Sequence, residues 1–367
     1  MRIAFFGSSL LSAYWNGAAT YYRGILKALA ARGHDVVFLE PDAFDRQRHR
    51  DIEPPEWARV VVYAADAEGM RAALAHAGRA DFVVKASGVG VLDAELEAAV
   101  LDAAPADALV AFWDVDAPAT LARLEGDARD PLRTLLPDYD LVLTYGGGAP
   151  VRDAYLRLGA RLCAPIYNAL DPDDHHPVPP DARFAADLAF LGNRLPDREA
   201  RVEAFLLAGA ALAPDQRFLL GGSGWDGKPL PANVRWLGHV STRDHNALNS
   251  TAKCVLNVSR ESMAQNGWSP ATRVFEAAGA GACLITDRWQ GIEMFLEPGE
   301  EVLVADDGAA VADIVRRIDT AKARRIGAAA RERLLAEHTY ARRALAVEEA
   351  LAGAASDRHP AQGMVAS

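Results

Sequence analysis

Short apolar runs alternate with amphipathic segments along most of the chain. Between two such runs, residues 20–34 (TYYRGILKALAARGH) have apolar positions at helical spacing and reach Gly33, a helix stop signal. Runs that are apolar on both faces and separated by helices are typical of parallel strands covered on both sides. The first half therefore predicts a doubly wound α/β domain, with strands in RIAFFG (2–7), DVVFLEP (35–41), RVVVYAA (59–65), DFVVKAS (81–87), ALVAFWDVD (108–116) and DLVLTYG (140–146).

A second series of the same kind follows a segment rich in Pro and Asp, CAPIYNALDPDDHHPVPP. Its expected strands lie in residues 186–193, 217–224, 234–240, 253–259 and 281–287. We predict an α/β fold of two Rossmann-like halves whose strand ends face a central cleft, where such sheets bind ligands. The expected division is an N-terminal domain of residues 1–168, a linker of 169–183, a C-terminal domain of 184–340, a helix of 341–354 and a disordered tail of 355–367.

Length and composition agree with this division and narrow the class of partner. The 367 residues suit two domains, and 50% apolar with 24% charged residues is an ordinary globular balance. A net charge of −11 disfavours nucleic acid or an anionic membrane as the main partner, because both attract basic surfaces. No stretch approaches the roughly 18 unbroken apolar residues of a membrane span. Three scattered cysteines resemble reduced core residues, so we expect a cytoplasmic protein.

Residues 269–287 (SPATRVFEAAGAGACLITD) carry the most specific chemistry. Ser269 and Pro270 form a helix-start signal, and Gly267 before them lets the backbone approach a ligand closely. A helix N-terminus at a strand end favours an anion such as a phosphate. Glu276, further along the helix, could then accept hydrogen bonds from two neighbouring hydroxyls. A ribose diol beside a diphosphate has that layout.

The small residues after Glu276 are expected to let the helix and the next strand lie close together. An alternative is that Arg273 and Glu276 form an ordinary surface pair at i,i+3 while the glycines end the helix. The residues of this segment alone leave both interpretations open.

The order of motifs in the second half resembles the C-terminal domain of GT-B glycosyltransferases. The similarity rests on FLGNRLPDR, FLLGGSG, VRWLGHVSTRDHNALNSTAKCVLNVSRES and SPATRVFEAAGAGACLITDRWQGIEMFLEPGEEVLVA. It is greatest to the CgeB-like (spore maturation protein) group, which is related to the retaining family-four enzymes. The segment PIYNALDPDDHHP is similar to the inter-domain segment of that group. The resemblance implies transfer of a sugar from a nucleotide-diphosphate sugar, a UDP-sugar, to an acceptor that the sequence does not identify.

This resemblance assigns roles to several residues. Glu276 matches the glutamate that holds the nucleotide ribose, and Arg194 and Arg198 fall where basic residues neutralise the diphosphate leaving group; solvated arginines at a helix start are the alternative. Trp268 occupies the position where the retaining enzymes have a second glutamate, so the stereochemistry and the contacts to the donor sugar stay open. The full set predicted to bind the donor nucleotide is Glu276, Arg194, Arg198, Gly267, Trp268, Ser269 and Arg273.

In the first half, Asn16, Gly17 and Thr20 resemble a loop that approaches phosphate or acceptor, with a plain turn as the alternative. Asp114 ends a strand where related enzymes carry polar residues near the sugar, and it is the candidate catalytic carboxylate. Asp116 fits a helix N-cap better.

No cofactor or metal is expected. Adjacent His175 and His176 suggest a metal site, but side chains at i and i+1 diverge, and the resemblance implies metal-independent transfer.

Two further functions remain open on the sequence: a nucleotide-sugar epimerase of the same architecture, and a non-catalytic nucleotide-sugar binding protein, which Trp268 makes conceivable. A dinucleotide dehydrogenase is disfavoured because the first strand leads into GSSLLSAYWNG, which lacks G-x-G-x-x-G spacing.

Overall fold

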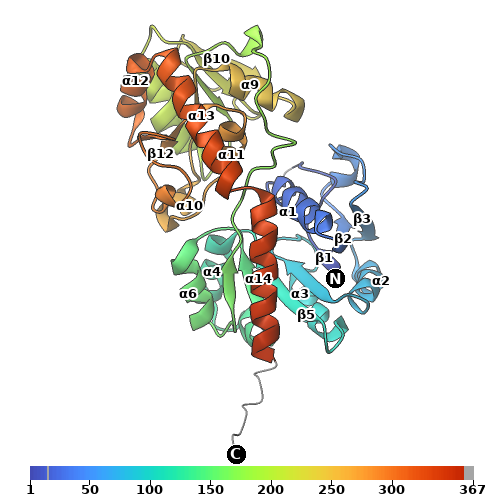
Figure 1. Cartoon of the computed structure of the whole chain (residues 1–367). Helices are drawn as coiled ribbons and strands as arrows, with labels where there is room; N and C mark the ends of the chain where they lie inside the picture. Colours follow the sequence, from blue (N-terminus) through green and yellow to red (C-terminus); the bar gives the residue numbers. More distant parts are fainter. Residues whose placement is uncertain (15, 359–367) are drawn as a thin grey trace, which may run out of the picture. The chain divides into compact units, whose positions relative to one another are not determined.

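The chain folds into two compact units, each built on one parallel sheet (Figure 1). The computed structural model describes residues 1–14 and 16–358. Unit 1 comprises Met1–Tyr167 together with the segment that begins at Tyr340, and unit 2 is Asn168–Thr339. The predicted linker of 169–183 therefore belongs to unit 2.

Unit 1 contains a seven-stranded sheet in the order β3-β2-β1-β4-β5-β6-β7, with every neighbouring pair parallel. The strands are β1 (Arg2–Phe6), β2 (Asp35–Asp42), β3 (Ala58–Ala64), β4 (Phe82–Ala86), β5 (Leu109–Asp114), β6 (Leu141–Thr144) and β7 (Cys163–Pro165). The helices are α1 (Ala19–Ala31), α2 (Ala67–Ala77), α3 (Asp93–Ala103), α4 (Ala117–Gly126), α5 (Pro131–Leu135), α6 (Gly148–Arg157) and α14 (Tyr340–Arg358).

The last helix, α14, completes unit 1 by packing on α1. A Cβ atom at Gly24 of α1 would lie 2.1 Å from the ring of Tyr340, so only glycine allows this approach. Arg32 and Glu348 join the same two helices by an ion pair of 2.6 Å. The helix continues through Arg358, beyond the predicted range of 341–354, and the rest of the predicted disordered tail lies outside the described residues.

Unit 2 contains a six-stranded parallel sheet in the order β10-β9-β8-β11-β12-β13. The strands are β8 (Leu188–Leu191), β9 (Phe218–Gly221), β10 (Val234–Gly238), β11 (Cys254–Asn257), β12 (Cys283–Asp287) and β13 (Leu303–Ala305). The helices are α7 (Glu199–Val202), which continues through a π-helical turn (Glu203–Leu207) into α8 (Ala208–Leu212), then α9 (His245–Thr251), α10 (Glu261–Asn266), α11 (Thr272–Gly279), α12 (Gly308–Arg317) and α13 (Thr320–Glu337).

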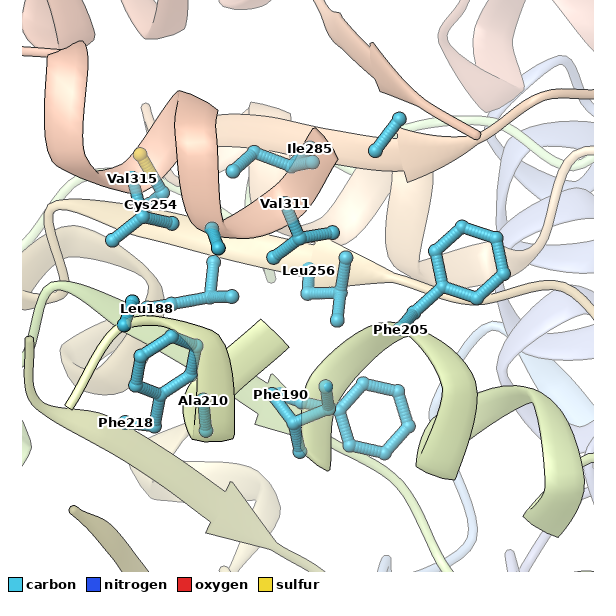
Figure 2. Packing of buried hydrophobic residues seen from close by; sticks show 14 of the residues in the cluster. Leu188, Phe190, Phe205, Ala210, Phe218, Cys254, Leu256, Ile285, Val311 and Val315 are labelled. Carbon is cyan, nitrogen blue, oxygen red and sulfur yellow. The ribbon is translucent and has the colours of Figure 1, made fainter. Parts of the chain in front are cut away.

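Apolar side chains from strands and helices interlock in the core of unit 2. Figure 2 shows Phe190 and Phe218 from the sheet with Phe205 and Val311 from the helices that cover it. The runs that are apolar on successive residues are the central strands, because both faces of the sheet are covered. Both faces of the sheet are therefore buried, and the strands end at its edge.

The predicted α/β class and the parallel strands are confirmed. The sequence pattern missed β7 and β13, each only three residues long, because so short a run has no readable period. No helix in the described part of the chain is both long and apolar enough to cross a membrane.

Candidate functional site

The sheet order of unit 2 reverses direction between β8 and β11. In doubly wound sheets, ligands bind at the carboxyl ends of the strands beside such a reversal. Residues 192–198 follow β8, and α11 lies between β11 and β12. Most residues predicted to bind the donor nucleotide belong to these two segments.

Arg198 follows β8, at the N-cap position of α7, and lies over the ring of Phe190, 5.8 Å from its centroid. One of its terminal nitrogens donates to the carbonyl of Asn193 at 2.7 Å, while its Nε is buried with no hydrogen-bond partner in residues 1–14 and 16–358. Gly192 makes room for it, because a Cβ there would lie 2.8 Å from the Arg198 Nη2. Burial, and then the positive charge of Arg273, lower the pKa of Arg198 to about 10.

Arg273, the second residue of α11, approaches the same ring at 5.9 Å. Burial lowers its pKa, and the negative charge of Glu276 opposes that shift. Among the described residues, neither Arg198 nor Arg273 has a carboxylate within ion-pair distance. Two partly buried cations that repel each other and lack an anion form a site suited to a doubly charged ligand.

Arg194 is placed differently. Its guanidinium pairs with Glu199 at 2.7 Å, and the same carboxylate oxygen accepts from Lys228 at 2.9 Å. The Glu199 hydrogen bond raises the pKa of Arg194. Its charge is already neutralised inside unit 2, unlike that of Arg198.

Helix α11 begins at Thr272, so the predicted start, with Ser269 as cap and Pro270 as first helical residue, is corrected by two residues. Ala271 is the N-cap residue, and no side chain caps the first N–H groups of the helix. Ser269 is buried before the helix and is not its cap. The uncapped N–H groups leave the positive end of α11 open to an anion.

The segment before α11 is held in an unusual backbone conformation. Gly267 has φ +68°, and Trp268, a bulky residue, has φ +42°. The Trp268 N–H donates to the carbonyl of Gln290 at 2.6 Å, and a Cβ at Gly291 would lie 2.1 Å from the indole ring. Backbone strain of this kind persists only where its surroundings enforce it, and here the loop after β12 does so.

Glu276 is the fifth residue of α11, roughly 6 Å along the axis from the first. Its carboxylate Oε1 lies 4.0 Å from the Nε2 of His175, and no hydrogen bond to the carboxylate is found in the described residues. The carboxylate also acts electrostatically on His245, the first residue of α9. Sequence reasoning missed both imidazoles as neighbours of Glu276. The only signal was the position of His175 in a segment expected to link the domains.

The burial of His245 predicts a pH dependence of stability. Burial lowers its pKa below the usual 6.5, although Glu276 opposes the shift. Between the lowered pKa and 6.5 the unfolded chain binds a proton that the folded chain does not, so stability rises with pH in that window and falls as the solution is acidified. We expect the melting temperature of wild type to fall more steeply from pH 7 to pH 5 than that of His245→Gln. Parallel pH profiles of the two proteins would contradict the prediction.

The small residues after Glu276 serve a contact that was not predicted. A Cβ at Gly279 would lie 2.3 Å from the Leu170 side chain and 3.2 Å from the His175 carbonyl oxygen. Gly281, at φ +79°, follows the end of the helix and faces Pro177. These glycines therefore allow α11 to lie close to the segment 170–177, as well as to β12, the strand that follows it in the chain.

In unit 1, the structure encloses Asp114 completely. Its Oδ1 accepts from Ser87, Thr120 and the Asp116 N–H at 2.7 to 3.0 Å, and its Oδ2 accepts from the Tyr155 hydroxyl. A carboxylate occupied in this way has no lone pair facing solvent, so this geometry gives no support to the predicted catalytic role. Asp116 precedes α4 as expected, but its side chain makes no capping hydrogen bond.

The three residues predicted to form a ligand-binding loop in unit 1 lie in different environments. Asn16 is buried and donates to the carbonyls of Ser9 and Ser12, so its amide shapes the loop after β1. Gly17 is exposed with open space at its Cβ position, and Thr20 is half-buried in α1. Of the three, Gly17 leaves the most room for a ligand.

Within residues 1–14 and 16–358, no group of three or more His, Cys, Asp and Glu side chains is placed to hold a metal ion. His176 is exposed, whereas His175 is largely buried beside Glu276.

Comparison with known proteins agrees with this architecture. Residues 198–349 match the family described as "Glycosyl transferase-like", a region that includes Arg198, Arg273 and Glu276. No protein of curated function matches the chain by sequence.

Several solved structures share the fold across both units. HepE from Anabaena, solved in complex with UDP-glucose, superposes with a TM-score of 0.66 at 16% identity, covering 96% of this chain and 100% of its own. Sucrose-phosphate synthase from Thermosynechococcus elongatus gives 0.68 at 18% identity, covering 96% and 98%. AviGT4, a glycosyltransferase involved in avilamycin A biosynthesis, gives 0.61 at 18% identity, covering 97% and 98%. The chain has the GT-B fold. In this GT-B chain, unit 1 is the N-terminal Rossmann-like domain and unit 2 is the C-terminal one.

Proposed function

We propose that this protein is a glycosyltransferase that takes a sugar from a nucleotide-diphosphate donor, a UDP-sugar. The observation that carries the proposal is the pair Arg198 and Arg273, which converge on Phe190 and have no carboxylate partner among the described residues; Arg273 lies one helical turn before Glu276. Their two positive charges match a diphosphate. The Glu276 carboxylate, which accepts no hydrogen bond from the part of the chain that the structure describes, matches the ribose diol.

The chemistry follows from where charge develops. The bond between the anomeric carbon and the β-phosphate oxygen breaks, and the electron pair moves onto the leaving diphosphate. The acceptor hydroxyl oxygen bonds to the same carbon and loses its proton. Fixed guanidinium groups and the open N–H groups of α11 stabilise the growing negative charge on the phosphate, which lowers the barrier.

HepE has been solved with UDP-glucose, which favours UDP as the nucleotide. We assign the chain to the CgeB-like group on the motif order of its second half. We further propose that transfer needs no metal, because Arg198 and Arg273 supply the positive charge. A cytoplasmic location is proposed because the three cysteines are free thiols in the core.

Incubation with a panel of UDP- and GDP-sugars, with and without candidate acceptors and with EDTA, tests the function. We expect slow release of UDP from one UDP-sugar in water alone, faster release with a true acceptor, and no loss of activity in EDTA. Recovery of a changed nucleotide sugar would instead indicate an epimerase. Tight binding with no turnover, even with acceptors present, would indicate a binding protein.

A further inference from the structure

His175 lies beside the Glu276 carboxylate in unit 2. Its Nε2 is 4.0 Å from the Glu276 Oε1, and its Nδ1 is buried with no hydrogen-bond partner among the described residues. Both side chains are mostly buried, with 11% and 15% of their surface exposed. A separation of 4.0 Å is too long for a hydrogen bond, but it is short enough for an imidazole N–H to attract a carboxylate in a partly buried setting.

The backbone around His175 is fixed from several directions. The His175 N–H donates to the Asp171 carbonyl at 2.9 Å, and the Asn246 side chain of α9 donates to the Asp174 carbonyl at 2.8 Å. Gly279 allows this segment to lie against α11, because a Cβ there would collide with Leu170. These contacts fix the backbone that places the His175 imidazole beside Glu276.

We propose that His175 is a positioning residue that orients the Glu276 carboxylate toward the ribose hydroxyls of the donor. This inference rests on the proposed function, in which Glu276 binds the ribose. A glutamate side chain has three rotatable bonds, and fixing them on ligand binding costs conformational entropy. An imidazole N–H beside Oε1 favours one carboxylate orientation before the ligand arrives, so less of that cost is incurred on binding. The buried Nδ1 fits this role, since it has no hydrogen-bond partner in the described part of the chain that would turn the ring away from Glu276.

A double-mutant cycle on UDP binding tests the proposal. The dissociation constant of UDP is measured by calorimetry for wild type, His175→Ala, Glu276→Gln and the double variant. His175→Ala is expected to weaken UDP binding about fivefold or more in the wild-type background and to have no effect in the Glu276→Gln background. His175→Gln, whose amide can place an N–H near the position of Nε2, is expected to recover part of the affinity.

His176→Ala is the matched control, because His176 is adjacent in sequence but exposed. It is expected to bind UDP as wild type does. With 2′-deoxy-UDP, wild type and His175→Ala should bind with more similar affinities than they do with UDP, since one of the oriented hydroxyls is missing. Melting curves of the free variants show whether each is folded.

The outcomes separate the inference from the function. Wild-type protein that does not bind UDP overturns the proposed donor, and the inference with it. UDP binding that is lost in Glu276→Gln but unchanged in His175→Ala overturns the role of His175 alone. An equal loss from His175→Ala in both backgrounds also overturns it, because the effect would then not pass through Glu276.

Discussion

Replacement of Glu276 by alanine is expected to abolish measurable UDP binding while the melting temperature of the free protein barely moves. Two hydrogen bonds from ribose hydroxyls to a carboxylate contribute about 3 kcal/mol or more, which corresponds to roughly a 100-fold or greater rise in the dissociation constant. Stability should hold because no hydrogen bond within the described residues depends on this carboxylate. Calorimetric titration with UDP and thermal denaturation of the free protein measure the two quantities.

The matched control for this variant is Glu337→Ala, which removes an exposed carboxylate of the same unit. It should leave UDP binding unchanged. If Glu276→Ala unfolds the protein, the residue is structural, and if it binds UDP like wild type, the proposed ribose site is wrong.

Arg198→Met is expected to lower kcat/KM for the donor by about 100-fold to 1,000-fold, the usual cost of losing one fixed donor to a developing negative charge. The folded protein should not lose stability, because the variant removes a partly buried cation that Arg273 repels and that has no carboxylate partner among the described residues. Arg273→Met should lower kcat/KM to a similar degree. Initial rates with the active UDP-sugar and thermal denaturation provide the test.

Arg194→Met makes the comparison decisive. The Arg194 guanidinium is paired with Glu199, so its loss should change donor turnover little. The opposite ranking, with Arg194 essential and Arg198 dispensable, would mean that the diphosphate binds on the other side of the loop after β8.

The fold was readable from the sequence because its signal is repeated. Apolar runs on successive residues between helical segments recur through both halves, and each adds support for a parallel sheet. Element boundaries carry no such repetition. At α11, Ser269 and Pro270 have the right chemistry for a helix start, yet the helix begins two residues after Pro270, at Thr272.

The candidate site was only partly readable, because the folded chain decides which side chains pair and which charges are free, and no local pattern identifies those partners. Arg194 and Arg198 look alike in FLGNRLPDR, yet Lys228 and Glu199 form the network that holds Arg194. Asp114 looks like an open carboxylate at a strand end until Thr120 and Tyr155 enclose it. No local sequence pattern predicts that His175 lies beside Glu276, which is about a hundred residues later in the chain.

The return of α14 to unit 1 has a consequence for synthesis. The ribosome completes residues 1–167 before unit 2, yet the helix that packs on α1 through Gly24 and Tyr340 is translated only after all of unit 2. Unit 2 is continuous in sequence and can fold as it emerges. Unit 1 must wait with one flank of α1 uncovered, so the nascent chain exposes an apolar surface until α14 leaves the tunnel.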